Sequence, residues 1–249
     1  MESERFNKLA ETKNNLIISY LKLRNLIGFS GMLLPFILVL TSKTDHTAKL
    51  FVEKSLSVYY YTNSGDILVV TMSVIGVFLF TYNGYNKTEK KITTLASISS
   101  LGIAFCPTAI SQVISSTIHV ENKIVPNVFG VEWHSIFATL LFISMSIMTL
   151  VYFPKSDKQQ LNTQKKNRNI IYKICGWVMV VSVVLLVTYY IWKPLFLKNI
   201  PVVLIFETII LEAFGLSWIT KGQTLWPDGE HYVYKGYNEL KNWLKSVFN

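Results

Sequence analysis

The sequence predicts an all-α, polytopic membrane protein: a bundle of six transmembrane helices with both termini in the cytoplasm. Hydrophobic residues make up 51% of the 249-residue chain and charged residues only 16%, whereas about a quarter of the residues in a soluble domain are usually charged. The charges cluster in short runs, with long apolar stretches between them. Lysine and arginine are also divided unequally between alternate connecting segments, which predicts the orientation of the bundle.

Six apolar segments are long enough to cross about 30 Å of hydrocarbon. They are residues 25–41, 67–85, 92–115, 133–153, 170–192 and 201–220. Pro201 suits the start of the sixth helix, because a missing N–H costs nothing in the first turn, and Pro154 ends the fourth. Pro35 and Pro107 fall inside predicted spans, where we expect them to kink the helices.

The orientation follows from the basic residues. With the N-terminus inside, the inner segments hold 17 of the 24 lysines and arginines and the outer segments hold six, as the positive-inside rule requires. Residues 1–24 are therefore predicted to be cytoplasmic and residues 25–220 to form the transmembrane domain. In residues 221–249, apolar positions recur every three or four residues, which predicts an amphipathic helix on the inner leaflet. The predicted location is the inner or plasma membrane of the cell.

The net charge of +9 is explained by these cytoplasmic segments, and no nucleic-acid recognition motif accompanies it. The expected partner is the lipid bilayer, and nucleic acid is not expected. The small residues Ala96, Ser100, Ala104 and Thr108 recur every four positions and predict a close helix-packing face. A membrane-protein partner or a second copy of the chain is a further possible partner.

Four ionisable residues fall within the predicted spans, where they are costly and therefore candidates for function. They are Asp66, His134, Glu207 and Glu212. Asp66 and His134 open the second and fourth spans at the outer end, and Glu207 lies about 9 Å below the outer start of the sixth. These three predict an outward-facing polar site. Glu212 lies deeper and, five residues from Glu207, points roughly 140° away from it, so the two glutamates do not predict a paired-carboxylate site.

Each of the four also has a structural interpretation. Asp66 follows Asn63, Ser64 and Gly65 and could simply cap a helix. His134, beside Trp133, could bond lipid headgroups, Glu207 could pair with a basic residue, and Glu212 could be hydrogen-bonded to another helix. The long segment from Asp45 to Gly65 could form a re-entrant lid over an outer cavity or an ordinary interfacial loop.

Several motifs resemble a group of uncharacterised bacterial multi-pass membrane proteins. They are Tyr59-Tyr60-Tyr61-Thr62-x-x-x-Asp66, Ile75-Gly76-Val77-Phe78-Leu79-Phe80-x-Tyr82-x-Gly84-Tyr85, Phe105-x-Pro107-Thr108, His134, and Glu207 with Phe214-Gly215-x-Ser217-Trp218-x-x-Lys221-Gly222. The resemblance implies a six-helix membrane fold but no activity. Relatives are expected to have an arginine where this chain has Gly65. A distant similarity to membrane hydrolases of the ceramidase and progestin-receptor type is disfavoured, because those need several histidine ligands and the spans contain only His134.

The sequence leaves three classes of function open. The first, which we favour, is a site that binds or moves an ion, a proton or a small polar ligand. The second is a membrane-embedded hydrolase that acts on a lipid, with or without a metal. The third is a non-catalytic partner or pore-forming subunit. No residue spacing identifies a cofactor, a metal, a substrate or a catalytic residue.

Overall fold

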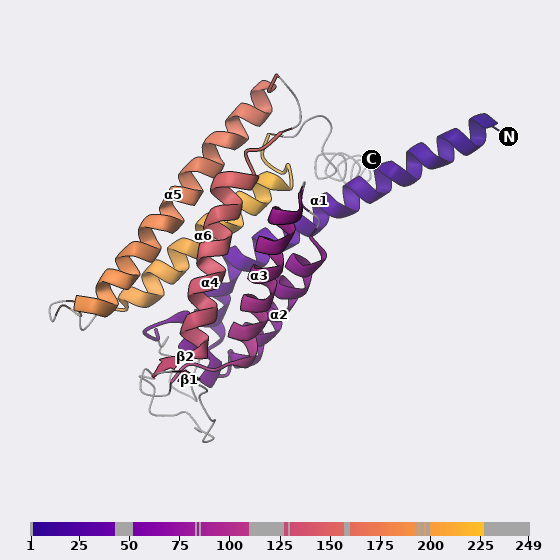
Figure 1. The fold of residues 1–249 in the computed structure, drawn as a ribbon. Helices are drawn as coiled ribbons and strands as arrows, with labels where there is room; N and C mark the ends of the chain where they lie inside the picture. Colours follow the sequence, from indigo (N-terminus) through magenta and orange to yellow (C-terminus); the bar gives the residue numbers. More distant parts are fainter. Residues whose placement is uncertain are drawn as a thin grey trace, which may run out of the picture.

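The computed structural model describes residues 2–42, 52–82, 84, 86–109, 127–128, 130–156, 160–192, 194, 197 and 200–226, with side chains from residue 19 onward. Most of these residues lie in α-helices (Figure 1). The helices are α1 (Glu2–Thr41), α2 (Gly65–Thr81), α3 (Lys87–Phe105), α4 (Trp133–Ile147), α5 (Thr163–Trp192) and α6 (Val202–Lys221). A 3₁₀-helix η1 (Leu56–Tyr61) precedes α2, and a π-helix η3 (Met148–Tyr152) continues α4. A short antiparallel pair, β1 (Asn127–Val128) and β2 (Val131–Glu132), leads into α4.

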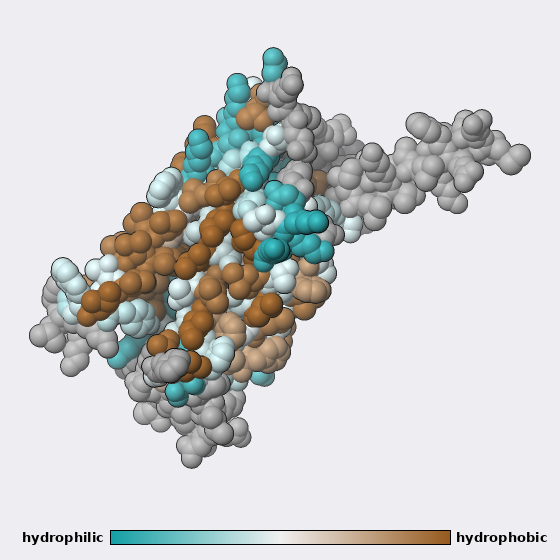
Figure 2. Space-filling model, in the orientation of Figure 1, coloured by the Kyte–Doolittle hydropathy of each residue, from teal (hydrophilic) through white to brown (hydrophobic). Residues whose placement is uncertain are grey.

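Within the described residues, four helices are long and apolar enough to cross a membrane. They are Ser19–Thr41 of α1, Trp133–Tyr152 of α4 and η3, α5, and α6. The apolar helix α2 has only 17 residues, and α3 begins with a charged turn and carries many hydroxyl side chains. Large apolar side chains are exposed along α5, including Trp177, Val181 and Val184. Figure 2 shows apolar residues across the middle of the visible face and hydrophilic ones gathered at its upper end. This surface is that of a multi-pass membrane protein.

The predicted third span is wrong in its extent. The helix ends at Phe105 rather than near residue 115, because Pro107 has no N–H and disfavours helical geometry at Cys106 before it. Pro107 therefore terminates the helix instead of kinking it. The helix also begins earlier than predicted, at Lys87, where the side chain of Asn86 accepts a hydrogen bond from the backbone of Glu89 at 2.8 Å.

The first helix is longer than the predicted span of residues 25–41. It runs without interruption from Glu2 to Thr41, through Pro35, so residues 2–24 continue the same helix. The predicted amphipathic helix near the C-terminus falls in residues 227–249, outside the described residues.

Helices α1 and α6 pack very closely because glycines face one another. A Cβ atom at Gly28 would lie 2.7 Å from the carbonyl oxygen of Gly215, and one at Gly215 would lie 2.5 Å from the carbonyl oxygen of Gly28. Small residues of this kind let two membrane helices approach to backbone contact. This seam fixes α6, which carries both candidate glutamates, against the first helix.

The small-residue face predicted on the third helix is confirmed as a packing face. Ala96, Ser100 and Ala104 are buried on α3, and Thr108, which lies beyond the end of the helix, is also buried. The hydroxyl of Ser100 donates to the carbonyl of Met72 on α2 at 2.7 Å. Helices α2 and α3 therefore form a close pair beside α1 and α4.

Candidate functional site

A cavity of about 190 Å³ lies between α4, α5, α6 and the segment that precedes η1. Its polar lining includes Ser55, Ser57, His134, Thr139, Tyr190 and Glu207. Aliphatic side chains of α5, such as Val183, Leu186 and Val187, form much of the opposite wall. The cavity thus combines a few polar groups with a largely apolar wall, which is the usual character of a small-molecule site.

His134, the second residue of α4, is buried and is hydrogen-bonded through both ring nitrogens. Its Nδ1 lies 2.7 Å from the carbonyl oxygen of Cys106, and its Nε2 lies 2.6 Å from Oγ of Ser57. A carbonyl oxygen can only accept, so the geometry assigns the proton of the neutral ring to Nδ1. The Ser57 hydroxyl then donates to Nε2. The end of α3 and the segment before α2 together fix the imidazole.

Glu207, in the second turn of α6, is 9% exposed. Its Oε2 accepts a hydrogen bond from the backbone N–H of Leu56 at 2.6 Å. One turn earlier, the backbone N–H of Leu204 donates to the carbonyl of Lys54 at 2.9 Å. The segment from Lys54 to Ser57 is therefore bonded to α6 on one side and to His134 of α4 on the other.

Residues 52–64, around η1, pack over this end of the bundle, and we call them the lid. Leu56, Val58 and Tyr59 are buried, and burial raises the pKa of the Tyr59 phenol above its ordinary value. The hydroxyl of Ser64 donates to the carbonyl of Leu38 on α1 at 3.0 Å. The lid interpretation therefore fits residues 52–64 better than an interfacial loop.

A second, deeper space of about 40 Å³ adjoins the same residues. Ser57, His134 and Glu207 line it together with apolar side chains of α1, α2, α4 and α6. The imidazole and the carboxyl group therefore line both spaces.

The structure brings together two of the four residues singled out from the sequence. His134 and Glu207 line one cavity, but Asp66 is exposed in the first turn of α2 and lines neither space. Glu212 is half-buried on another face of α6, and its Oε1 is buried without a hydrogen-bond partner among the described residues. The two glutamates therefore do not share a site, in agreement with their spacing.

Sequence reasoning missed three polar residues near the cavity. Ser57 contacts His134, and the Tyr190 side chain lines the cavity from α5. Glu132, just before α4, accepts hydrogen bonds from the Thr108 hydroxyl at 3.0 Å and from the Ala109 N–H at 3.1 Å. Only Ser57 gave a sequence signal, since it opens the run Ser57–Thr62 in the segment flagged as a lid.

Among the described residues, no group of three or more histidine, cysteine, aspartate or glutamate side chains is placed to hold a metal ion. Comparisons of the chain with protein-family models, with curated proteins and with solved structures give no match. The resemblance to uncharacterised bacterial membrane proteins therefore stays a prediction. The class that the structure supports is a multi-pass helical membrane protein with a polar cavity near one end of the bundle.

Proposed function

We propose that the chain is a six-span protein of the cell membrane, with both termini cytoplasmic, whose outer cavity binds a small cation or a small polar ligand. The shorter helices α2 and α3 pack side by side, which suits a pair that crosses with the other four. The basic side chains of Lys155, Lys165 and Lys221 lie at the end of the bundle opposite the cavity, as the positive-inside rule requires for a cytoplasmic face.

The observation that carries the proposed binding function is the pair of hydrogen bonds from neighbouring lid residues to the two ionisable groups. Leu56 donates its N–H to Glu207, and Ser57 donates its hydroxyl to His134. A ligand that bonds to either group competes with the lid, so binding and lid position are coupled.

The lining also indicates the chemistry of the ligand. One carboxyl group, one imidazole and the rings of Tyr190 and Phe142 face the cavity, and none of the described residues that line it is a lysine or an arginine. Carboxylates and aromatic faces attract cations. The volume of about 190 Å³ is roughly that of six liquid waters, so a small ligand fits whole, whereas only one part of a lipid molecule can enter.

The test is ligand-induced stabilisation of the purified full chain in neutral phosphatidylcholine nanodiscs. The probes are sodium, potassium, tetramethylammonium and glycerol, each compared at constant ionic strength. We expect at least one probe to raise the unfolding temperature of the wild type but not that of Glu207→Gln. Glu212→Gln is the matched control, because it removes a carboxyl group from the same helix outside the cavity, and it should respond like the wild type.

Two results would contradict this function. One is a wild type that responds to none of the probes, and the other is a Glu207→Gln variant that responds as strongly as the wild type. If binding is present, proton and cation flux into proteoliposomes distinguishes a binding protein from a transporter, since only a transporter gives flux that Glu207→Gln abolishes.

A second candidate function rests on the contact between Ser57 and His134. A serine hydroxyl 2.6 Å from an imidazole whose other nitrogen is held by a carbonyl has the geometry of a nucleophile beside its general base. Ser57 Oγ would bond to the acyl carbon of a lipid ester as its proton passes to Nε2 and then to the leaving alkoxide. Water would then hydrolyse the acyl-serine and release the fatty acid.

A fluorophosphonate probe tests this second function, because an activated serine displaces the fluoride and keeps the phosphonyl group. The hydrolase function requires labelling of the wild type that Ser57→Ala abolishes and Ser55→Ala retains. Ser55 is the matched control, since it lines the same cavity without contacting the imidazole. An unlabelled wild type, or labelling that survives Ser57→Ala, would leave only the binding function.

A further inference from the structure

Helix α6 has an outward-facing stripe of residues that carries a carboxyl group. The stripe consists of Ile205, Ile209, Glu212 and Leu216, whose spacing of three or four residues places them within about 60° of one another around the helix. Ile205 is 43% exposed and Ile209 is 36% exposed, while Glu212 and Leu216 are partly exposed. Glu212 lies near the middle of this 20-residue apolar helix. When α6 crosses a membrane, its carboxyl group therefore lies at the depth of the hydrocarbon, on the surface of the bundle.

This position is unusual for an ionisable residue of a membrane helix. Such residues almost always face the interior of the bundle or a water-filled cavity, and they pair with one another or with other polar groups. Glu207 follows this rule, because it lines the outer cavity and accepts a hydrogen bond from Leu56. Glu212 does not line that cavity, and its buried Oε1 has no hydrogen-bond partner among the described residues. The described part of the bundle therefore leaves this oxygen unsatisfied.

The packing of α6 prevents the helix from turning Glu212 inward. The two glutamates point roughly 140° apart around the helix. A rotation that brought Glu212 to the cavity would separate Gly215 from the backbone of Gly28 on α1, and it would break the hydrogen bond between Leu56 and Glu207. It would also disturb the packing of α6 against α5. A partner for the Glu212 carboxyl group must therefore approach from outside the bundle.

We propose that the stripe is the interface with a second copy of the chain, and that the two Glu212 carboxyl groups bond to each other there. A carboxyl group in hydrocarbon is neutral, because burial of an unpaired ion is very costly. A neutral carboxyl group contains one O–H donor and one carbonyl acceptor. Two such groups that face each other form two hydrogen bonds, and each satisfies the other completely.

A second copy suits this stripe better than a different protein does. Two copies that cross the membrane in the same direction are related by a two-fold axis along the membrane normal, so equivalent residues meet at the same depth. A second copy therefore always presents both a donor and an acceptor opposite Glu212. The other members of the stripe, Ile205, Ile209 and Leu216, are aliphatic and can pack against their own equivalents. A different protein would need a hydrogen-bond donor at that one depth.

The first test is the oligomeric state of the full chain in lipid. Chains that carry one fluorophore at the N-terminus are reconstituted in phosphatidylcholine liposomes, and stepwise photobleaching counts the chains in each spot over a range of protein-to-lipid ratios. Glu212→Leu removes the hydrogen bonds, and we expect it to weaken dimerisation about tenfold. Glu212→Gln should retain most of the dimer, because an amide is also both a donor and an acceptor. Since position 212 is on the surface, both variants should fold, which their unfolding temperatures verify.

The second test identifies the face that forms the interface. The photo-crosslinking amino acid benzoylphenylalanine is placed at position 209 on the stripe or, as the control, at position 181, where Val181 is exposed on α5. We expect crosslinked dimers from position 209 and not from position 181. The proposal is overturned if the wild type is monomeric at every protein-to-lipid ratio, which would leave the stripe to lipid or to a different protein. It is equally overturned if Glu212→Leu dimerises as strongly as the wild type, or if only position 181 gives crosslinks.

Discussion

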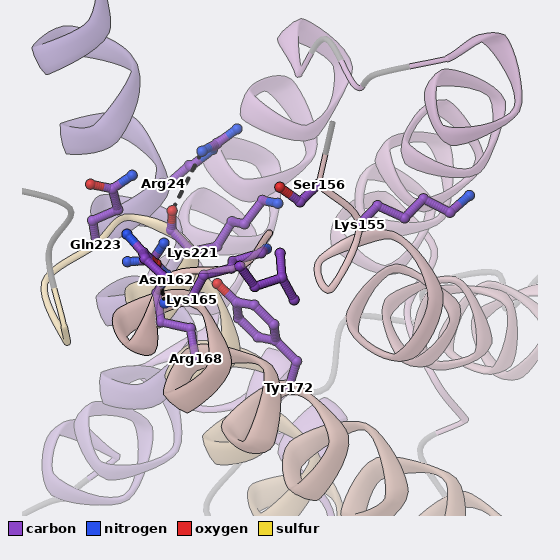
Figure 3. A pocket seen from close by; sticks show the side chains of 10 residues that line it. Arg24, Lys155, Ser156, Asn162, Lys165, Arg168, Tyr172, Lys221 and Gln223 are labelled. Carbon is purple, nitrogen blue, oxygen red and sulfur yellow. Dashed lines mark hydrogen bonds between the residues drawn. The ribbon is translucent and has the colours of Figure 1, made fainter. Parts of the chain in front are cut away.

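The two ends of the bundle carry cavities of almost equal size and different chemistry, and we name them outer and inner after the proposed orientation. The outer cavity is about 190 Å³, with one carboxyl group, one imidazole and an aliphatic wall. The inner pocket is about 180 Å³ and is lined by the cationic side chains of Arg24, Lys155, Lys165, Arg168 and Lys221 (Figure 3). The outer groups are fixed by hydrogen bonds to a lid between helices, and the inner ones by carbonyls at helix ends. The comparison teaches that the chemistry of a cavity depends on its position along the membrane normal. Isolated polar groups are tolerated inside the bundle, whereas clustered charge is tolerated at its basic end.

The largest expected loss of stability comes from a change in the seam between α1 and α6, because this seam supports both ends of the bundle. In Gly215→Leu the new side chain meets Met32 and the backbone of Gly28, so the helices must separate. Overpacking of this kind costs about 3 kcal/mol. Unfolding in denaturant should show that loss, and the ligand response of the outer cavity should fall with it. Ile209→Leu, at an exposed position of the same helix, should be nearly neutral, and a Gly215→Leu variant as stable as the wild type would contradict the close seam.

The next largest loss of stability should come from a change at the outer end alone. Glu207→Leu leaves the buried N–H of Leu56 without its acceptor, which costs about 1–3 kcal/mol. The unfolding temperature of the variant should fall. Glu212→Leu provides the comparison, because the Glu212 carboxyl has an oxygen without a hydrogen-bond partner among the described residues and its removal should destabilise the protein less. The reverse order of stability would show that the lid bond contributes little.

A smaller effect is expected within the lid itself. Ser57→Ala removes the hydroxyl that donates to Nε2 of His134, at a cost of about 1 kcal/mol. Nitrogen NMR of the labelled imidazole, assigned by comparison with His134→Gln, should show a changed Nε2 signal. Ser55→Ala should leave that signal unchanged. If the signal is the same in wild type and Ser57→Ala, the contact does not form in solution.

The smallest expected effect is a dependence of stability on alkaline pH, to which the tyrosines of the lid contribute. Burial raises the pKa values of the Tyr59 and Tyr61 phenols, so the folded chain keeps these protons when the unfolded chain begins to lose them. Their contribution to stability is complete below pH 10, the ordinary tyrosine value, and is lost as the pH rises through the higher folded values. Tyrosinate absorbance should reveal late-titrating tyrosines, and their number should fall by one in Tyr59→Phe. Titration of all tyrosines at the ordinary value would show that the lid is open.

The sequence predicted those residues of the site that stand out from their immediate neighbours in the chain. His134 and Glu207 were identified because an ionisable residue in an apolar run is conspicuous in sequence. The hydrogen bonds that form the site join residues far apart in the chain. Ser57 and His134 are 77 positions apart, and Leu56 and Glu207 are 151 positions apart. Sequence spacing carries no information about such contacts. Asp66 showed the same local signal, but α2 presents its side chain to the exterior.

The sequence by itself determined the class of the protein, because long apolar runs report directly on transfer into lipid. Where the chain departs from prediction, a backbone rule or a tertiary contact prevailed: Pro107 ended the third helix. Only the tertiary structure decided which polar groups lie close together, because this depends on how the helices are rotated about their axes and how the lid packs between them. The tertiary structure alone also forms the inner pocket, where basic residues that appear in the sequence as separate charges come together from four parts of the chain.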